Sequence, residues 1–138
     1  MAIKFAAAVR NARLDAIETT IGASPVLKIW SGSAPATFAS TSTGSVLATL
    51  TLPSDWLANA SAGAKTISTG AWSDASADNT GTAGHFRIYT STGTAPQIQG
   101  TITGSTGGGD MILDNISISS GQTVTITAFT LTDGNASS

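Results

Sequence analysis

Apolar residues near the N-terminus recur at the spacing of a helix. Three of them lie at i, i+3 and i+7 and form one stripe: Leu14, Ile17 and Ile21. Gly22 is a natural C-cap, and Pro25 prevents the helix from resuming. The pattern predicts one helix over residues 6–21.

After Pro25 the pattern changes to short segments in which apolar residues alternate with Thr and other polar residues. In the clearest segment, Phe86 and Ile88 share one face, and the other face carries His85, Arg87 and Tyr89. Alternation of this kind is typical of an antiparallel sheet with one buried face. Eight segments are predicted as strands: 26–30, 46–52, 65–72, 85–90, 97–103, 111–113, 116–119 and 122–132.

The last of these strands contains a change of parity. Val124 and Ile126 occupy even positions, whereas Phe129 and Leu131 occupy odd ones. A regular strand cannot place all four side chains on one face, because successive side chains alternate. A bulge near residues 127–128 reconciles them, and burial on both faces is the alternative.

The connections between the strands are long and rich in Gly, Ser, Thr and Ala. Hairpin loops usually have about 2–5 residues, so longer ones favour a sandwich with crossovers between its sheets. We therefore predict a mainly β fold, an antiparallel β-sandwich or jelly-roll-like domain of about eight short strands with an N-terminal α-helix. Residues 1–24 are predicted as a helical arm and residues 25–138 as the β-sandwich domain.

The chain is unusually poor in charge. Charged residues make up 10% of its 138 residues, against about 25% in average globular proteins. A surface of small uncharged residues lets another protein approach without desolvating ions, which suggests an assembly, although a secreted adhesion domain could look the same. Residues 1–28 hold four basic and two acidic side chains, a net +2, so a basic helix could dock on an acidic partner surface.

The residues that usually carry chemistry are scarce or isolated. Without cysteine there is no thiolate nucleophile and no Cys-based metal site, and His85 has no neighbour in a catalytic motif. The glycines at 107–109 precede a strand rather than a helix, which favours a hairpin loop over a phosphate site. Loop aspartates are explained by turns rather than by calcium. No catalytic, metal-binding or cofactor-binding residue is therefore predicted.

Nucleic acid, membranes and secretion are not indicated either. The net charge is −2, and the chain has no basic stripe outside the helix. No apolar run reaches the length that spans a bilayer. Lys4 interrupts the opening of the chain, so the start is interpreted as mature protein rather than as a signal peptide.

Three tryptophans lie outside the core pattern: Trp30, Trp56 and Trp72. Tryptophan is enriched at binding hot spots, so these rings could stack on sugars or anchor an interface. Packing under a long loop is the alternative.

Six segments carry a resemblance to a known group of proteins. They read RNARLDAIE at 10–18, IGASPVLKI at 21–29, SGSAP at 31–35, LATLTLP at 47–53, GTAGHFRIY at 81–89 and GGDMILDN at 108–115. With these segments, nearly the whole chain resembles small proteins encoded by tailed bacteriophages. The resemblance implies a virion component, located in the particle and assembled in the bacterial cytoplasm, and it brings no catalytic motif.

Size and composition then favour a capsid decoration, or cement, protein. Such a protein would bind the major capsid protein or another virion protein, as a homo-oligomer and in particular a trimer. The candidate contact residues are Ile3, Phe5, Val9, Arg10, Arg13, Leu14 and Ile17 in the arm, and Trp56 and Trp72 in the β domain. Deletion of residues 1–21 should leave a folded domain that no longer binds shells.

Two other hypotheses stay open. The first is a tail or host-recognition module whose loops around Trp56, Trp72 and residues 73–84 bind glycans. The second is an enzyme that depends on His85.

Overall fold

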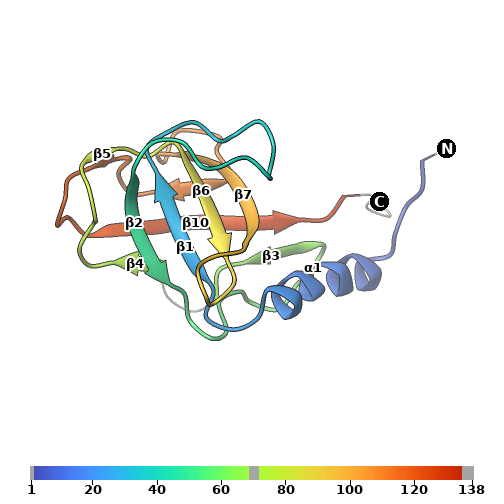
Figure 1. Cartoon of the computed structure of the whole chain (residues 1–138). Helices are drawn as coiled ribbons and strands as arrows, with labels where there is room; N and C mark the ends of the chain where they lie inside the picture. The colour runs from blue at the N-terminus through green and yellow to red at the C-terminus, as the bar shows by residue number, and fades with distance from the viewer. Residues whose placement is uncertain (1, 69–71, 135–138) are drawn as a thin grey trace.

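The computed structural model describes residues 2–68 and 72–134, which form one helix and ten strands (Figure 1). The elements are α1 (Ala7–Ile21), β1 (Val26–Trp30), β2 (Val46–Thr51), β3 (Ala64–Thr66), β4 (Trp72–Asp74), β5 (Gly81–Thr82), β6 (His85–Tyr89), β7 (Pro96–Thr103), β8 (Met111–Leu113), β9 (Ser117–Ile118) and β10 (Val124–Thr132).

The predicted helix is confirmed, and it ends where the sequence indicates. Gly22 adopts a φ of 92°, a value that favours glycine, and its N–H donates to the carbonyl oxygen of Glu18 at 2.9 Å. The predicted strand over 65–72 is wrong as one element: β3 ends at Thr66 and β4 begins at Trp72, while residues 69–71 lie outside the described residues. β5 was not predicted, because two residues are too short to show alternation.

Eight strands form one curled sheet in the order β2-β1-β6-β7-β8-β10-β3, with β4 paired to β10, and β5 and β9 form a separate pair. Nearly all pairings are antiparallel, as predicted, but β7 and β8 run parallel. The pairing is parallel because residues 104–110 return along β7 before β8 begins, so that β8 starts beside Ile102 and runs in the same direction as β7. Asp110 accepts hydrogen bonds there from the backbone N–H and the hydroxyl of Thr101, at 2.9 and 3.0 Å.

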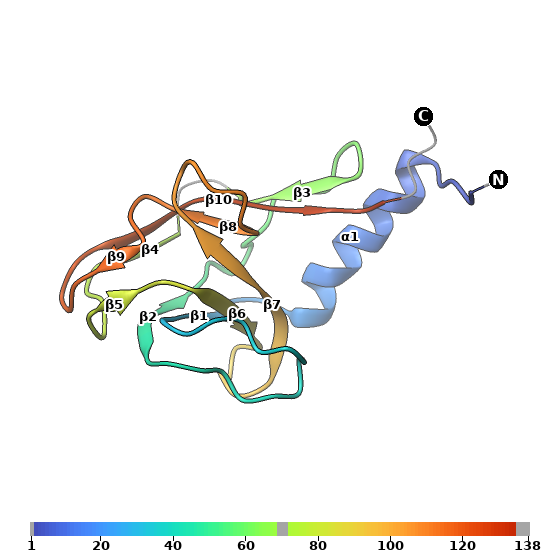
Figure 2. The same cartoon turned by 90° about the horizontal axis from the view of Figure 1, so that it is seen from above.

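The curl brings two halves of the sheet face to face, with β1, β2 and β6 in one layer and β4, β8 and β10 in the other (Figure 2). The core fills the space between them. Phe86 of β6 meets Phe129 of β10 edge to face, with ring centroids 5.5 Å apart, and Trp72 of β4 lies 5.6 Å from Phe129. The mainly β, sandwich-like fold with an N-terminal helix is thus confirmed.

The predicted bulge in the last strand is confirmed. In the pairing of β10 with β8, the register shifts between Ile126 and Ala128, which leaves Thr127 as the extra residue. The shift changes parity, so that Val124, Ile126 and Phe129 are all buried, at 1%, 0% and 3% exposure.

β6 departs from the predicted pattern of one buried face. Its inner residues Phe86 and Ile88 lie in the core, but His85, Arg87 and Tyr89 on the outer face are also buried. The segment between β1 and β2, residues 31–45, covers this outer face. His85 and Arg87 are both hydrogen-bonded to it. The sequence shows the alternation but not the cover.

Candidate functional site

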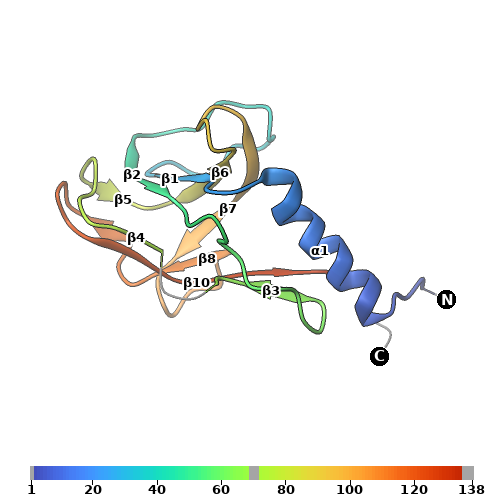
Figure 3. The ribbon, with the colours of Figure 1, turned by 90° about the horizontal axis from the view of Figure 1, so that it is seen from below.

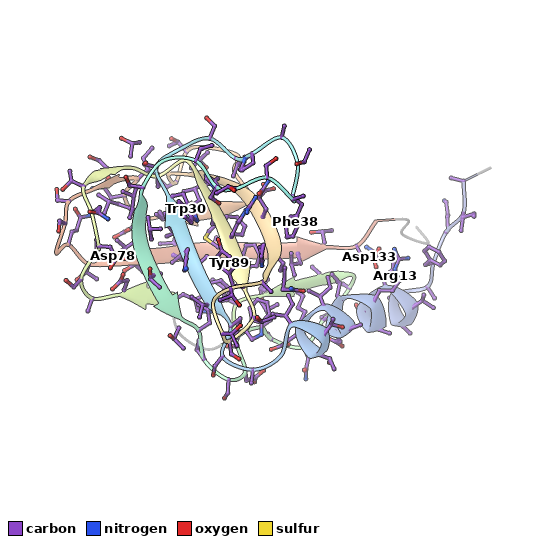
Figure 4. The ribbon with its side chains drawn as sticks, in the orientation of Figure 1. Arg13, Trp30, Phe38, Asp78, Tyr89 and Asp133 are labelled. Atoms are coloured by element: carbon purple, nitrogen blue, oxygen red, sulfur yellow. The ribbon has the colours of Figure 1, made fainter. Side chains whose placement is uncertain are left out.

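Helix α1 is fastened to its own β domain by its charged side chains. Arg10 donates to the carbonyl oxygen of Asp133 from Nε and Nη2, at 3.1 and 2.7 Å. Arg13 forms an ion pair with the carboxylate of Asp133 at 3.0 Å (Figure 4). The positive charges of α1 are therefore engaged within the chain, which removes the basis for a basic arm that reaches an acidic partner.

The acidic side chains of α1 hold a buried lysine of β3. Lys65 is 1% exposed, and its Nζ lies 2.7 Å from Asp15 and 2.8 Å from Glu18. Burial acts to lower the pKa of Lys65, but the two carboxylates outweigh it and the pKa is raised. The hydrogen bond from Lys65 likewise lowers the pKa of Asp15.

These contacts bear on the predicted boundary at residue 24. The boundary separates helix from strands in the sequence, but Lys65 depends on α1 for its counter-charges. Deletion of residues 1–21 would leave a buried ammonium without them, so the expectation that the remainder stays folded no longer follows.

The exposed side of α1 is mostly uncharged. We call this surface the helix outer face; its uncharged residues are Ala8, Val9, Ala12, Ala16 and Thr19, and Arg13, whose side chain is 49% exposed, lies beside Val9 one turn along the helix. Val9 is 46% exposed, and Ile3 in the segment before α1 is 73% exposed. The segment after β10 lies beside the N-terminal half of α1, where Asp133 contacts Arg10 and Arg13 (Figure 4).

The predicted contact residues fall into two groups. Ile3, Phe5 and Val9 lie at or near the surface, and Ile17 lines a groove of about 380 Å³ between α1 and the sheet. Leu14 is buried under the helix at 3% exposure, so its prediction as a contact residue is corrected.

Trp56 and Trp72 also require correction. They are 0% and 3% exposed, and their rings lie 6.1 Å apart in the core. The indole N–H of Trp56 donates to the carbonyl oxygen of Gly22, which ties the core to the end of α1. Neither ring offers a face to a sugar or to a neighbouring chain.

A different group of aromatic residues lines a pocket on the outer face of the sheet. We call it the aromatic pocket; its volume is about 400 Å³, within the range of small-molecule sites. It lies between β6, β1 and the covering segment, where Figure 4 shows Trp30, Phe38 and Tyr89. Its lining residues are Trp30, Phe38, Ala39, Ser40, Thr41, Ser42, Arg87, Tyr89, Thr94 and Pro96.

The alternating pattern of β6 predicts an ordinary polar outer face and therefore gives no indication of this pocket. One sequence feature could have indicated the pocket. Arg87 and Tyr89 are two residues apart on one strand, so a cation and an aromatic ring lie next to each other on the same face. Trp30 lies on the same face of β1, since it pairs directly with His85.

His85 stacks on Trp30 of the pocket, with ring centroids 6.1 Å apart, and connects to the covering segment. Its Nδ1 donates to the carbonyl oxygen of Gly32 at 2.6 Å, so Nε2 of the neutral ring accepts from the hydroxyl of Ser42 at 3.1 Å. Burial is the largest cause that lowers the pKa of His85, and the charge of Arg87 adds to it. The hydrogen bond to Gly32 acts in the opposite direction. The two hydrogen bonds of the ring hold the covering segment against the sheet.

The aspartates that sequence analysis assigned to turns do make turn contacts. Asp74 accepts from the backbone N–H of Ser76 at 3.0 Å, and Asp114 accepts from that of Asn115 at 2.8 Å. Across residues 2–68 and 72–134, no group of three His, Cys, Asp or Glu side chains is arranged to hold a metal ion. In the same residues, no helix has the length and apolarity to cross a membrane.

Comparison of the chain with protein-family models, with curated proteins and with solved structures gives no match.

Proposed function

We propose that this protein is a structural component of a tailed-phage virion, which binds the outside of the head shell and stabilises it. The observation that supports the proposal is the helix outer face. All four charged residues of α1 are bonded to the β domain, and the exposed side of the helix offers mainly alanine and valine to a partner, with the half-exposed Arg13 beside them.

Small uncharged residues favour the free energy of association at such a surface. Ion pairs that form at an interface must first be desolvated, which offsets much of their attraction. Small uncharged residues avoid this loss and let a second backbone come close. A helix of 15 residues is about 22 Å long at the standard rise per residue. It can therefore supply a continuous strip of contact.

The partner we propose is the major capsid protein, and the oligomeric state we propose for this chain is a homo-oligomer, in particular a trimer. Its low overall charge suits a molecule that packs against copies of a shell protein. The resemblance to phage-encoded proteins points in the same direction.

The direct experiment is sedimentation of the purified chain with assembled head shells of the same phage. Val9→Glu places a carboxylate in the helix outer face, and we expect binding to fall by at least about tenfold, since the carboxylate must be desolvated at the interface and a surface pair with Arg13, four residues on, offsets little of that cost. The matched control is Ala75→Glu, which adds the same charge at an exposed site after β4, at the far end of the molecule from α1 (Figure 1).

Circular dichroism should show that both variants are folded. Equal binding of Val9→Glu and wild type would remove the helix outer face from the contact. A chain that never sediments with shells would reject the proposed function.

A further inference from the structure

Arg87 carries a buried positive charge with no acidic partner in the described part of the chain. The residue is 4% exposed. Its Nε donates to the amide oxygen of Gln99 at 2.8 Å, and Nη2 donates to the carbonyl oxygens of Phe38 and Ser40 at 3.3 and 2.5 Å. Among the described residues, Nη1 has no hydrogen-bond acceptor. Buried charges are normally paired, whereas neutral dipoles alone hold this one.

A second cation lies beside it. Lys28 of β1 is directly opposite Arg87 in the register of β1 and β6, so their side chains share the outer face. Like charges in such a pair repel each other. Lys28 Nζ lies 5.0 Å from the ring centroid of Tyr89 and forms no ion pair among the described residues.

In the part of the chain that the structure describes, the nearest acidic side chains form no ion pair with Arg87 or Lys28. Asp74 and Asp78 accept hydrogen bonds from the backbone N–H and the hydroxyl of Thr49, at 3.3 and 2.9 Å, and Thr49 is directly opposite Lys28 on β2. These carboxylates therefore lie one strand beyond Lys28 and two strands from Arg87, which keeps a buried charge that favours an anion.

The walls around these charges are aromatic and hydroxylated. Trp30, Phe38 and Tyr89 offer ring surface, while the covering segment offers the hydroxyls of Ser40 and other residues. The indole N–H of Trp30 is buried and has no acceptor among the described residues. Buried polar groups are normally satisfied, so this donor lacks the partner that a buried N–H usually has.

We infer that the aromatic pocket binds the carboxylate of an acidic sugar, such as a hexuronic acid or a sialic acid. The guanidinium of Arg87 donates to the carboxylate, which is the pairing that arginine makes most strongly. The apolar face of the sugar ring lies against the aromatic side chains, and hydroxyl groups on both sides exchange hydrogen bonds. A pocket of about 400 Å³ suits one terminal sugar rather than a long chain.

This site is independent of the proposed contact with a shell. The covering segment lies on the side of the molecule away from the N-terminal half of α1 (Figure 3). A copy that is attached through the N-terminal half of the helix outer face, around Val9, therefore keeps its aromatic pocket open. The inference needs only the isolated chain.

The experiment is titration of the full chain with methyl glucuronide and with methyl glucoside, followed by NMR chemical shifts and calorimetry. These two sugars differ at one carbon, which bears a carboxylate in the first and a hydroxyl in the second. Because a hydrogen bond to a charged group is stronger than a neutral one, we expect the glucuronide to bind at least about tenfold more tightly. The methyl glycoside of N-acetylneuraminic acid tests a second acidic sugar, and a short peptide with a free C-terminus tests a carboxylate without a sugar ring.

Variants connect the binding to this pocket. Arg87→Gln should abolish the preference for the acidic sugar. Since Arg87 is buried and its loss could unfold the chain, Lys28→Gln and Phe38→Ala supply the independent test. Lys28→Gln should weaken binding about threefold through the loss of a nearby charge. Phe38→Ala, at a residue 45% exposed, should weaken binding by about threefold to tenfold through the loss of an aromatic wall.

Phe5→Ala is the matched control, because Phe5 also lies under an arginine, with Arg13 Cζ 4.7 Å from its ring centroid, but outside the pocket. Its affinity for the glucuronide should equal that of wild type. The inference is overturned if acidic and neutral sugars bind alike, if neither acidic sugar binds at millimolar concentration, or if Lys28→Gln and Phe38→Ala both bind like wild type. Tighter binding of the peptide than of both acidic sugars would overturn the assignment to sugars. Shell sedimentation by Lys28→Gln should be unchanged, which separates this inference from the proposed function.

Discussion

The buried ammonium of Lys65 allows a quantitative test of how α1 is held. Lys65 Nζ lies 2.8 Å from Oε2 of Glu18, and Oε1 of Glu18 accepts the backbone N–H of Leu57 at 3.1 Å. Glu18→Gln keeps the size of the side chain and can keep the bond to Leu57. It removes the negative charge, however, and turns an amide N–H₂ group, a donor, toward the ammonium.

The magnitude follows from the burial of the pair. Removal of one partner from a buried ion pair costs about 3–5 kcal/mol, and a hydrogen bond to a charged group contributes about 1.5–3 kcal/mol. The Glu18 side chain is 18% exposed, and Asp15 remains as a second partner of Lys65. We therefore expect Glu18→Gln to lower the free energy of unfolding by about 2 kcal/mol. Urea unfolding at pH 7, followed by tryptophan fluorescence, measures this change.

Lys65→Met provides the control, because it removes the buried charge and keeps an apolar side chain of similar length. In that background Glu18→Gln should cost less than about 0.5 kcal/mol. The double-mutant cycle should therefore give an interaction energy of about 1.5–2 kcal/mol. A cost of Glu18→Gln below about 0.5 kcal/mol in the otherwise native chain is what an exposed pair shows, and it would refute the anchoring of α1 through Lys65.

Two further predictions concern the core and the covering segment. Phe129→Ala should lower the free energy of unfolding by about 3–5 kcal/mol, because the ring is 3% exposed and touches both halves of the sheet. Phe38→Ala, at an exposed residue, should lower it by less than about 1 kcal/mol. Similar losses for the two variants in urea unfolding would contradict the assignment of the core. Burial lowers the pKa of His85 below its ordinary 6.5, so below pH 6.5 the unfolded chain binds a proton that the folded chain does not. The urea midpoint should therefore fall as the pH is lowered from about 7 to about 5, and it should fall less in His85→Gln. Asp15 does not contribute in this range, because its stabilising effect is lost only below its ordinary pKa of 3.8. An unchanged midpoint would contradict the neutral, buried state of His85.

Local features of the fold were predictable from local sequence. The spacing of Leu14, Ile17 and Ile21, followed by Gly22, defines a helix whatever surrounds it, because helical geometry repeats every few residues. The change of parity before Phe129 likewise required a bulge, since side chains on a strand alternate by geometry alone. β5 was missed because two residues carry no period.

The candidate sites depended on contacts between distant parts of the chain, and the sequence does not encode those in any short pattern. Alternation shows that His85, Arg87 and Tyr89 share a face of β6, but not that residues 31–45 fold over that face and enclose a pocket. Trp56 and Trp72 lie outside the predicted alternation of apolar and polar residues, which left both a surface role and packing open, and the curled sheet buries them.

The same division applies to α1. Its sequence determined a helix with an apolar stripe and four charged residues, because those properties depend on residues a few positions apart. Only the tertiary structure decided where the charges point. Arg10 bonds to a residue 123 positions away, and Asp15 bonds to one 50 positions away. Electrostatic partners are chosen by distance in space, and the folding of the β domain sets that distance.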